Sequence, residues 1–164
     1  MTESDSNWTW LSADDPRLAW RNVAEMVPRS AGYRVQRVEE NWRKRFPRDA
    51  ANRAVQSANV RLLFRSDASR IRLRLRNAYL FSEDLPACTG EVTCDGVEVG
   101  RFPVARRHDL IFEHPGGGEW GIHFPWLAAV LFLGLGVPAG AEIAQAPPDA
   151  ARQRWLCYGD SITH

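Results

Sequence analysis

The sequence predicts a mainly β protein, an antiparallel β-sandwich or jelly roll, over residues 1–136. Three observations support this fold class. Short runs of alternating apolar and polar residues recur along the chain, turn-forming residues separate them about every ten residues, and the βαβ rhythm of a parallel sheet is missing. A sandwich buries one face of each strand, and this alternation is the pattern that such burial produces.

The composition is that of an ordinary globular protein. The chain has 164 residues, of which 45% are hydrophobic and 25% are charged. This length corresponds to one domain, or to one domain and the beginning of a second. A net charge of +1 argues neither for nor against an acidic partner.

The first third of the chain contains two predicted strands and a loop. Residues 20–27 could form a strand or a short helix, and a strand is preferred because Pro28 follows at once and the apolar positions do not form a helical stripe. Residues 32–38 alternate apolar and polar side chains, as a strand does. Residues 41–54 are basic, irregular and interrupted by Pro47, so they predict a long surface loop.

The clearest alternation lies in residues 60–65 and 71–76. Apolar side chains occupy every second position of both runs, and a short polar turn at residues 66–69 joins them. Strict alternation in two runs with four residues between them predicts a hairpin, an antiparallel pair with one buried face.

Further strands follow at short intervals. The pair Asp95-Gly96 predicts a turn between strands at residues 91–94 and 97–102, and residues 110–112, 120–124 and 129–135 predict three more strands. Residues 137–151 are rich in Pro and Ala and predict a connector between domains.

The last stretch of the chain carries the chemistry. Trp155 to Tyr158 form a continuous apolar run, typical of a buried strand in a parallel sheet. Gly159 and Asp160 end this strand, so that Ser161 stands where a tight turn leads into a helix. A serine in that position presents its hydroxyl and its backbone N–H at the carboxyl edge of the sheet, as the nucleophiles of acyl-transfer enzymes do.

This stretch resembles the first sequence block of the SGNH (GDSL-type) hydrolases, a family of esterases, lipases and acetyl-carbohydrate esterases. The residues that match are Gly159-Asp160-Ser161-Ile162-Thr163. A chance match to five such letters in a chain of this length is on the order of one in ten thousand. The order of sandwich, connector and motif is similar to bacterial members with an N-terminal jelly roll. The resemblance implies that residues 152–164 begin an α/β hydrolase domain that is truncated here.

The resemblance also implies the roles of the residues. Ser161 would be the nucleophile, with its backbone N–H as one oxyanion-hole donor, and Gly159 and Asp160 would hold the turn. The family takes its other donors from later blocks and its base from a late Asp-x-x-His block, which this chain lacks. His108 and His114 lie upstream, where the family does not place its base. We therefore expect an enzyme family that cleaves ester bonds, and a chain that is inactive alone.

The expected substrate is an O-acyl ester, and acetylated carbohydrates are one class of it. The sandwich would then be an accessory domain that packs on the missing hydrolase domain. The alternative is a stand-alone β-sandwich module that binds a carbohydrate or another partner. Five tryptophans could stack on sugar rings, although each is more often a core residue: Trp8, Trp10, Trp42, Trp120 and Trp126.

Basic residues are dense on residues 60–76. They could form a nucleic-acid-binding stripe or a solvated, salt-bridged sheet face, and the near-neutral net charge favours the salt-bridged face and no nucleic-acid partner. The residues are Arg61, Arg65, Arg70, Arg72, Arg74 and Arg76.

No cofactor, metal site or membrane span is expected. The longest apolar run, residues 122–137, is short and contains Pro and Gly. No signal peptide is apparent at the N-terminus, so we expect a cytoplasmic protein with reduced thiols at Cys88, Cys94 and Cys157. Cys88 and Cys94 could form a disulfide if the protein were exported by another route.

Overall fold

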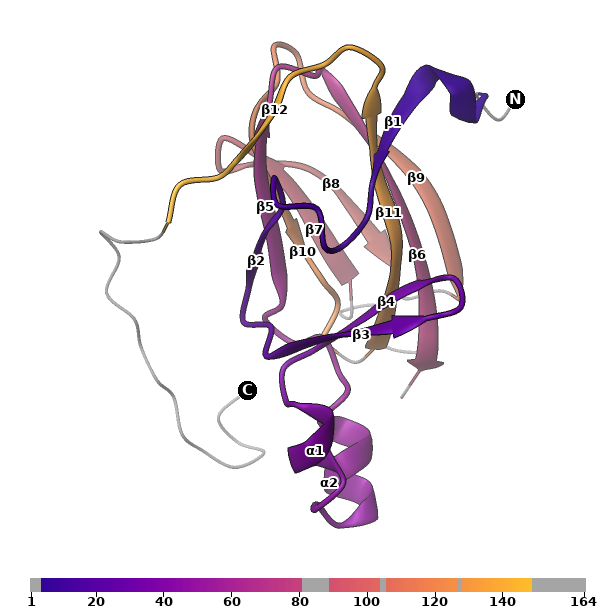
Figure 1. Cartoon of the computed structure of the whole chain (residues 1–164). Coiled ribbons are helices and arrows are strands. Elements are labelled where there is room, and N and C mark those ends of the chain that lie inside the picture. The colour runs from indigo at the N-terminus through magenta and orange to yellow at the C-terminus, as the bar shows by residue number, and fades with distance from the viewer. Residues whose placement is uncertain (1–3, 81–88, 104–105, 127, 149–164) are drawn as a thin grey trace.

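Two antiparallel β-sheets stack face to face in the computed structural model, which describes residues 4–80, 89–103, 106–126 and 128–148 (Figure 1). The first sheet has the strand order β3-β4-β11-β6-β9, and β1 pairs with the far end of β11. Its strands are β1 (Trp8–Leu11), β3 (Glu25–Arg29), β4 (Gly32–Gln36), β6 (Arg70–Leu80), β9 (Arg107–Glu113) and β11 (Ala128–Pro138).

The second sheet has the order β12-β5-β10-β7-β8, and β2 pairs with β5 beside β12. Its strands are β2 (Ala19–Arg21), β5 (Arg61–Ser66), β7 (Thr89–Cys94), β8 (Val97–Pro103), β10 (Gly118–His123) and β12 (Ile143–Gln145). A 3-10 turn, η1 (Asp5–Asn7), precedes β1, and two short helices, α1 (Glu40–Arg43) and α2 (Arg48–Arg53), lie between β4 and β5.

The eight consecutive strands β4 to β11 form a jelly roll. In one sheet the first, eighth, third and sixth of them are neighbours, and in the other the second, seventh, fourth and fifth are neighbours. This alternation of successive strands between two sheets is the double Greek key of a jelly roll. The predicted fold class, a mainly β antiparallel sandwich, is confirmed.

The core lies between the sheets and contains the residues that the alternation placed on the buried face. Leu62 and Phe64 of β5 are fully buried, and so are Ile71 and Leu73 of β6. Trp120 of β10 packs in the same cluster. Burial of these large apolar side chains is the main contribution to the stability of the fold.

The predicted hairpin between residues 60–65 and 71–76 is wrong. The two runs are strands, but β5 pairs with β10, β12 and β2, whereas β6 pairs with β11 and β9 in the other sheet. The apolar faces of β5 and β6 both contact the core between the sheets, from opposite sides. Alternation identifies the buried face of a strand, but it does not identify the neighbouring strand.

Two other local predictions need correction. The single strand expected at residues 20–27 is divided at Asn22, whose φ of 58° is left-handed, so that β2 and β3 join different sheets. The loop expected at residues 41–54 contains α1 and α2, and Pro47 is the N-cap residue of α2. Neither helix has a buried residue, so the apolar stripe that would predict a helix is missing.

The turn at Asp95-Gly96 is confirmed. Both residues have positive φ, 50° and 78°, as a type I′ turn requires, and β7 pairs with β8 on either side of them. The sandwich also continues into the predicted connector, residues 137–151. There β11 ends at Pro138, and β12 pairs with the last residues of β5.

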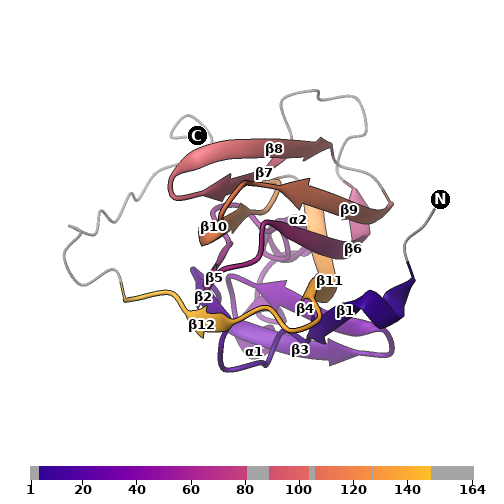
Figure 2. The same ribbon diagram turned by 90° about the horizontal axis from the view of Figure 1, so that it is seen from above.

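The two ends of the sandwich differ. Helices α1 and α2 project from one end, and Figure 2 views the molecule from the opposite end. At that opposite end the turns after β5, β7 and β11 meet.

Candidate functional site

The predicted catalytic block lies outside the described residues. Gly159, Asp160 and Ser161 follow residue 148, the last residue that the structure describes. Their roles as turn residues and nucleophile therefore stay predictions.

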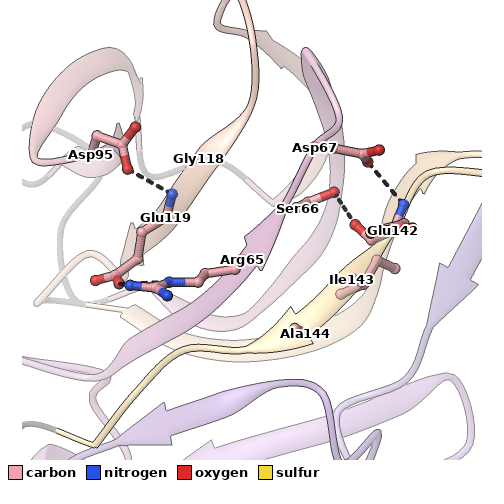
Figure 3. Close-up of a pocket in the computed structure, with 9 residues that line it drawn as sticks. All are labelled: Arg65, Ser66, Asp67, Asp95, Gly118, Glu119, Glu142, Ile143 and Ala144. Atoms are coloured by element: carbon pink, nitrogen blue, oxygen red, sulfur yellow. Dashed lines mark hydrogen bonds and ion pairs between the residues drawn. The ribbon is translucent and has the colours of Figure 1, made fainter.

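A shallow pocket of about 420 Å³ lies at the end of the sandwich opposite the helices (Figure 3). It surrounds the last residues of β5, with β10 on one side and β12 on the other. The sequence did not predict it, because the three strands that form it are far apart along the chain. The residues that line it are Arg65, Ser66, Asp67, Asp95, Gly118, Glu119, Glu142, Ile143 and Ala144.

One wall of the pocket consists of the β7–β8 turn and of an ion pair between β5 and β10. The Oδ1 atom of Asp95 accepts a hydrogen bond from the backbone N–H of Glu119 at 2.8 Å, and this bond holds the β7–β8 turn against β10. Arg65 donates through Nε and Nη2 to Oε2 of Glu119, both at 3.3 Å. The Arg65 side chain is largely exposed, so water screens this pair.

In the other wall, hydrogen bonds of Ser66 and Asp67 join the segment before β12 to the end of β5 (Figure 3). The Ser66 hydroxyl donates to the carbonyl oxygen of Glu142 at 2.7 Å and accepts from the backbone N–H of Ala68 at 3.1 Å. Oδ1 of Asp67 accepts from the backbone N–H of Glu142 at 2.8 Å. These side-chain bonds satisfy main-chain groups in the turn.

The chemistry available in the pocket is hydrogen bonding. The hydroxyl of Ser66 already donates a hydrogen bond to a main-chain carbonyl oxygen. The hydroxyl of Ser57, the other buried serine in the described part of the chain, likewise donates to the carbonyl oxygens of Pro125 and Ala128. A nucleophilic hydroxyl needs a base to accept its proton instead. The described residues of the pocket therefore offer no activated nucleophile.

The described histidines also lie outside the pocket. His108 is buried on β9 with its ring edge-on to Phe102, at 5.7 Å between centroids, and burial lowers the pKa of its imidazole. His114 packs edge-on against Trp120. Burial also lowers the pKa of His123, and the charge of Arg61 adds to this effect. These environments are those of packed histidines.

The six arginines do not form one stripe. Arg61 and Arg65 belong to β5 in the second sheet, and the other four, from Arg70 to Arg76, belong to β6 in the first. The salt-bridged alternative is confirmed for Arg65, which pairs with Glu119. It is also confirmed for two arginines of β6.

These two, Arg72 and Arg74, lie on the outer face of the first sheet. Both bind Asp109 of the neighbouring strand, with Arg72 Nε at 2.6 Å from Oδ1 and Arg74 Nε at 3.1 Å from Oδ2. Arg72 stacks on both Trp8 and Trp10, at 5.8 and 5.7 Å from the ring centroids, and is only 4% exposed. The face is thus covered here, whereas the sequence predicted that it would be solvated.

The five tryptophans divide into two groups. Trp8 and Trp120 are buried, and Trp10 is half-buried beneath the arginines of β6. Trp42 and Trp126 are exposed. Only the last two present a ring to solvent among the five that the sequence suggested as sugar-stacking residues.

No cluster of three or more His, Cys, Asp or Glu side chains that could hold a metal ion occurs in residues 4–80, 89–103, 106–126 and 128–148. Over the same ranges, no helix is both long enough and apolar enough to span a membrane. Cys94 is a free, buried thiol, and burial raises its pKa to about 11. Cys88 and Cys157 lie outside the described residues.

The solved structures that share this fold include an acyltransferase and a protein described as a lipase. The salicylyl-acyltransferase SsfX3 from a tetracycline biosynthetic pathway superposes with a TM-score of 0.76 at 18% sequence identity, over 89% of this chain. A protein from Bacteroides ovatus described as a GDSL-like lipase superposes with a TM-score of 0.64 at 16% identity, over 86% of this chain. In both cases the match covers 44% of the other chain, so this chain spans less than half of either protein.

Sequence comparison adds no family assignment. No protein-family model matches the chain, and no curated protein matches it. The similarity to the two solved structures is therefore one of fold.

Proposed function

We propose that this chain is the N-terminal part of an SGNH (GDSL)-type acyl-transfer enzyme, with Ser161 as its nucleophile. The observation that carries the proposal is that a catalytic motif and a matching fold occur in the same chain. The motif Gly159-Asp160-Ser161-Ile162-Thr163 follows a jelly roll whose fold matches a named acyltransferase and a protein described as a GDSL-like lipase. The motif and the fold are independent features, because the matched fold is described only as far as residue 148.

The proposed reaction is the cleavage of an O-acyl ester. The Ser161 oxygen attacks the ester carbonyl, the alcohol leaves, and water then hydrolyses the acyl-enzyme. The backbone N–H of Ser161 donates a hydrogen bond to the oxyanion that forms during attack, and losing one such donor costs about 10²–10³-fold in rate. Gly159 and Asp160 shape the turn that presents the serine. Acetylated carbohydrates are one class of substrate that fits this chemistry.

In this proposal the 164-residue chain is inactive on its own. A serine hydroxyl becomes an efficient nucleophile only when a base accepts its proton. The described histidines are packed in the sandwich, and the base and the other oxyanion donors would come from residues beyond His164. The sandwich, which extends to β12, would be the accessory domain, and residues 152–164 would be the start of the catalytic domain on which the sandwich packs.

A stand-alone binding module is the second candidate. The observation that favours it is the exposure of the rings of Trp42 and Trp126, since exposed aromatic faces can stack on sugars. This candidate predicts glycan binding that Ser161→Ala leaves unchanged and that Trp42→Ala weakens.

The decisive experiment starts from the source DNA beyond His164. We expect glycine and asparagine blocks and a late Asp-x-x-His block to follow, and the longer chain to hydrolyse a nitrophenyl ester. In that longer chain Ser161→Ala should lower kcat by four to six orders of magnitude, on the order of the loss for other serine nucleophiles. The matched control is Ser69→Ala, because Ser69 is an exposed serine in the turn before β6.

Three results would contradict the proposal. The first is a stop codon with no such blocks in any reading frame. The second is a longer chain in which Ser161→Ala and Ser69→Ala are equally active. The third is ester hydrolysis by the 164-residue chain that disappears in Ser161→Ala, which would disprove its inactivity.

A further inference from the structure

Exposed aromatic side chains lie at the helical end of the sandwich, on α1, directly after it and after β10. Of the five large hydrophobic residues that are exposed in the described part of the chain, three are aromatic: Trp42 at 55%, Phe46 at 40% and Trp126 at 39%. The other two, Val97 and Ile111, lie on β8 and β9. Exposed apolar residues that cluster, rather than occur singly, mark interaction sites.

Hydrogen bonds hold Trp126 at the same end as the helices. Ser57 follows α2 closely and bonds residues on both sides of Trp126. Its N–H donates to Ala128 at 2.8 Å and its hydroxyl to Pro125 at 2.6 Å. The N–H of Phe124 also donates to the carbonyl oxygen of Val60, at 3.1 Å. Residues on either side of Trp126 are thereby held against the segment that leads from α2 into β5.

Helix α1 is fastened firmly to the sandwich. The Glu40 carboxylate accepts from Arg34 of β4 at 2.9 Å and from Arg43 at 2.6 and 3.0 Å. The backbone N–H of Glu40 donates to Glu25 of β3 at 2.6 Å. A four-residue helix has little stability of its own, so these bonds fix the direction in which Trp42 projects.

The surroundings of these aromatic residues are basic. Arg45 lies over the Trp42 ring at 4.9 Å from its centroid. Six cationic and three anionic side chains lie between residues 37 and 53, and one of the anionic ones, Glu40, is bound to arginines. The other end of the molecule carries carboxylates around the pocket, so charge is distributed unevenly.

We propose that this helical-end surface, made of Trp42, Arg45, Phe46 and Trp126, is the docking face for the α/β domain that carries the remaining catalytic blocks. This inference rests on the proposed function. Tryptophan and arginine dominate the binding energy of protein interfaces, and rigid anchors lose little entropy on binding. The basic surroundings favour an acidic surface on the docked domain.

The length of the related structures supports this occupant. More than half of each solved chain lies outside the part that matches this one, so both proteins contain further chain against which a sandwich could pack. A second copy of this chain and an anionic lipid surface are the other occupants that an aromatic, basic surface could accept. The experiment below distinguishes them.

Hydroxyl-radical footprinting of the 164-residue chain and of the longer chain tests the inference. Oxidation of Trp42, Phe46 and Trp126 should fall severalfold in the longer chain, because the docked domain excludes water from them. Val97 and Ile111 are the internal controls, since both are exposed on strands away from the helical end, and their oxidation should stay unchanged. Equal oxidation of Trp42 in both chains would overturn the inference.

Thermal unfolding of a double variant and of a control variant gives a second test. Trp42→Ser combined with Phe46→Ser in the longer chain should separate thermal unfolding into two transitions, and Ile111→Ser should leave it unchanged. These residues are exposed in the sandwich, so the sandwich itself should stay folded. High salt should also promote the separation.

The outcomes separate the two proposals. A longer chain that hydrolyses esters through Ser161 while Trp42 stays reactive would overturn the docking face alone. A source gene without the catalytic blocks would overturn both. If the 164-residue chain dimerised and Trp42→Ser abolished the dimer, the inference would be overturned in favour of a second copy. If the chain sedimented with vesicles of anionic phospholipid and Trp42→Ser abolished this binding, the inference would be overturned in favour of a lipid surface.

Discussion

Two glycines of β11 make room for the tryptophans on the outer face of the first sheet. A Cβ atom on Gly136 would lie 3.2 Å from the rings of Trp8 and Trp10, and one on Gly134 would lie 3.2 Å from Trp10. The rings therefore lie close to the backbone of β11, where the arginines of β6 cover them. Side chains that looked like separate surface residues in the sequence form one layer.

Arg72 holds this layer together, and its loss should be costly. Arg72→Ala removes two hydrogen bonds to Asp109 and the one guanidinium group that lies over both rings, so we expect a loss of about 2–3 kcal/mol in the free energy of unfolding. The matched control is Arg76→Ala on the same strand, where the arginine is exposed and lies opposite Arg107, so the change should stay within about 0.5 kcal/mol. Urea unfolding measures both. Equal effects would show that burial of Arg72 contributes nothing.

Gly90 of β7 is a position where a larger residue has no room. A Cβ atom there would collide with the ring of Phe102, which is buried on the neighbouring strand β8. Gly90→Ala should therefore cost about 1–3 kcal/mol through overpacking. In the double variant with Phe102→Leu the cost should be less than the sum of the two single costs, because the smaller side chain relieves the collision. Additive costs in urea unfolding would contradict this explanation.

Charged side chains attach α1 to the sandwich. The Glu40 carboxylate accepts bonds from Arg43, Gln36 and Arg34, and the bond from Arg43 is the largest cause that lowers its pKa from 4.5 to about 2. Because the pKa of Glu40 is lower in the folded state than in the unfolded state, the ionised carboxylate stabilises the folded state. The stabilisation is complete above pH 4.5 and is lost as the pH falls towards 2.

Glu40→Gln should reveal this pH dependence. The variant should be less stable than the natural chain at pH 7, and the difference in the free energy of unfolding should shrink as the pH falls below 4.5. Urea unfolding at several pH values measures it. Glu39→Gln is the control, because Glu39 is exposed and makes no capping bond with its side chain. A difference that stayed constant between pH 7 and pH 3 would show that the Glu40 charge does not fasten α1.

Strands β5 and β6 illustrate what the sequence of a single element can and cannot encode. Each strand carries its own alternation, because the period of two follows from the geometry of a single strand. Their partners depend on the path of the whole chain, which takes β5 into one sheet and β6 into the other. The short polar link between them, residues 66–69, is compatible with a hairpin in one sheet and equally with a connection from one sheet to the other.

At the scale of the whole molecule, the end of the sandwich can be tested by truncation. A chain of residues 1–148 retains every described strand and should unfold cooperatively, with the stability of the 164-residue chain. A chain of residues 1–136 loses the buried Val137, two of the pairs between β11 and β1, and all of β12, so it should be clearly less stable. Thermal unfolding followed by near-UV circular dichroism compares the three chains. Equal stability of the chain that ends at residue 136 would place the sandwich boundary where the sequence predicted it.

The molecule also has two chemically different ends. Carboxylates and main-chain bonds surround the pocket at one end, whereas tryptophan, phenylalanine and arginine project at the other. Neither end could be recognised in the sequence. The pocket needs β5, β10 and β12 side by side, and residues 41–54 lack the apolar periodicity that would have predicted helices.

Local features of the chain were predictable because local physics produces them. Alternation at residues 60–65 and 71–76 showed which side chains are buried, and Asp95-Gly96 showed a turn whose left-handed backbone those two residues tolerate. The motif around Ser161 indicates chemistry from five adjacent letters and stays a prediction. Tertiary structure alone decided which strands are neighbours, why Arg72 is buried, and that Trp42 and Trp126 share one end. Each of these depends on contacts between residues distant in the chain, and such contacts leave no periodic signal in a single sequence.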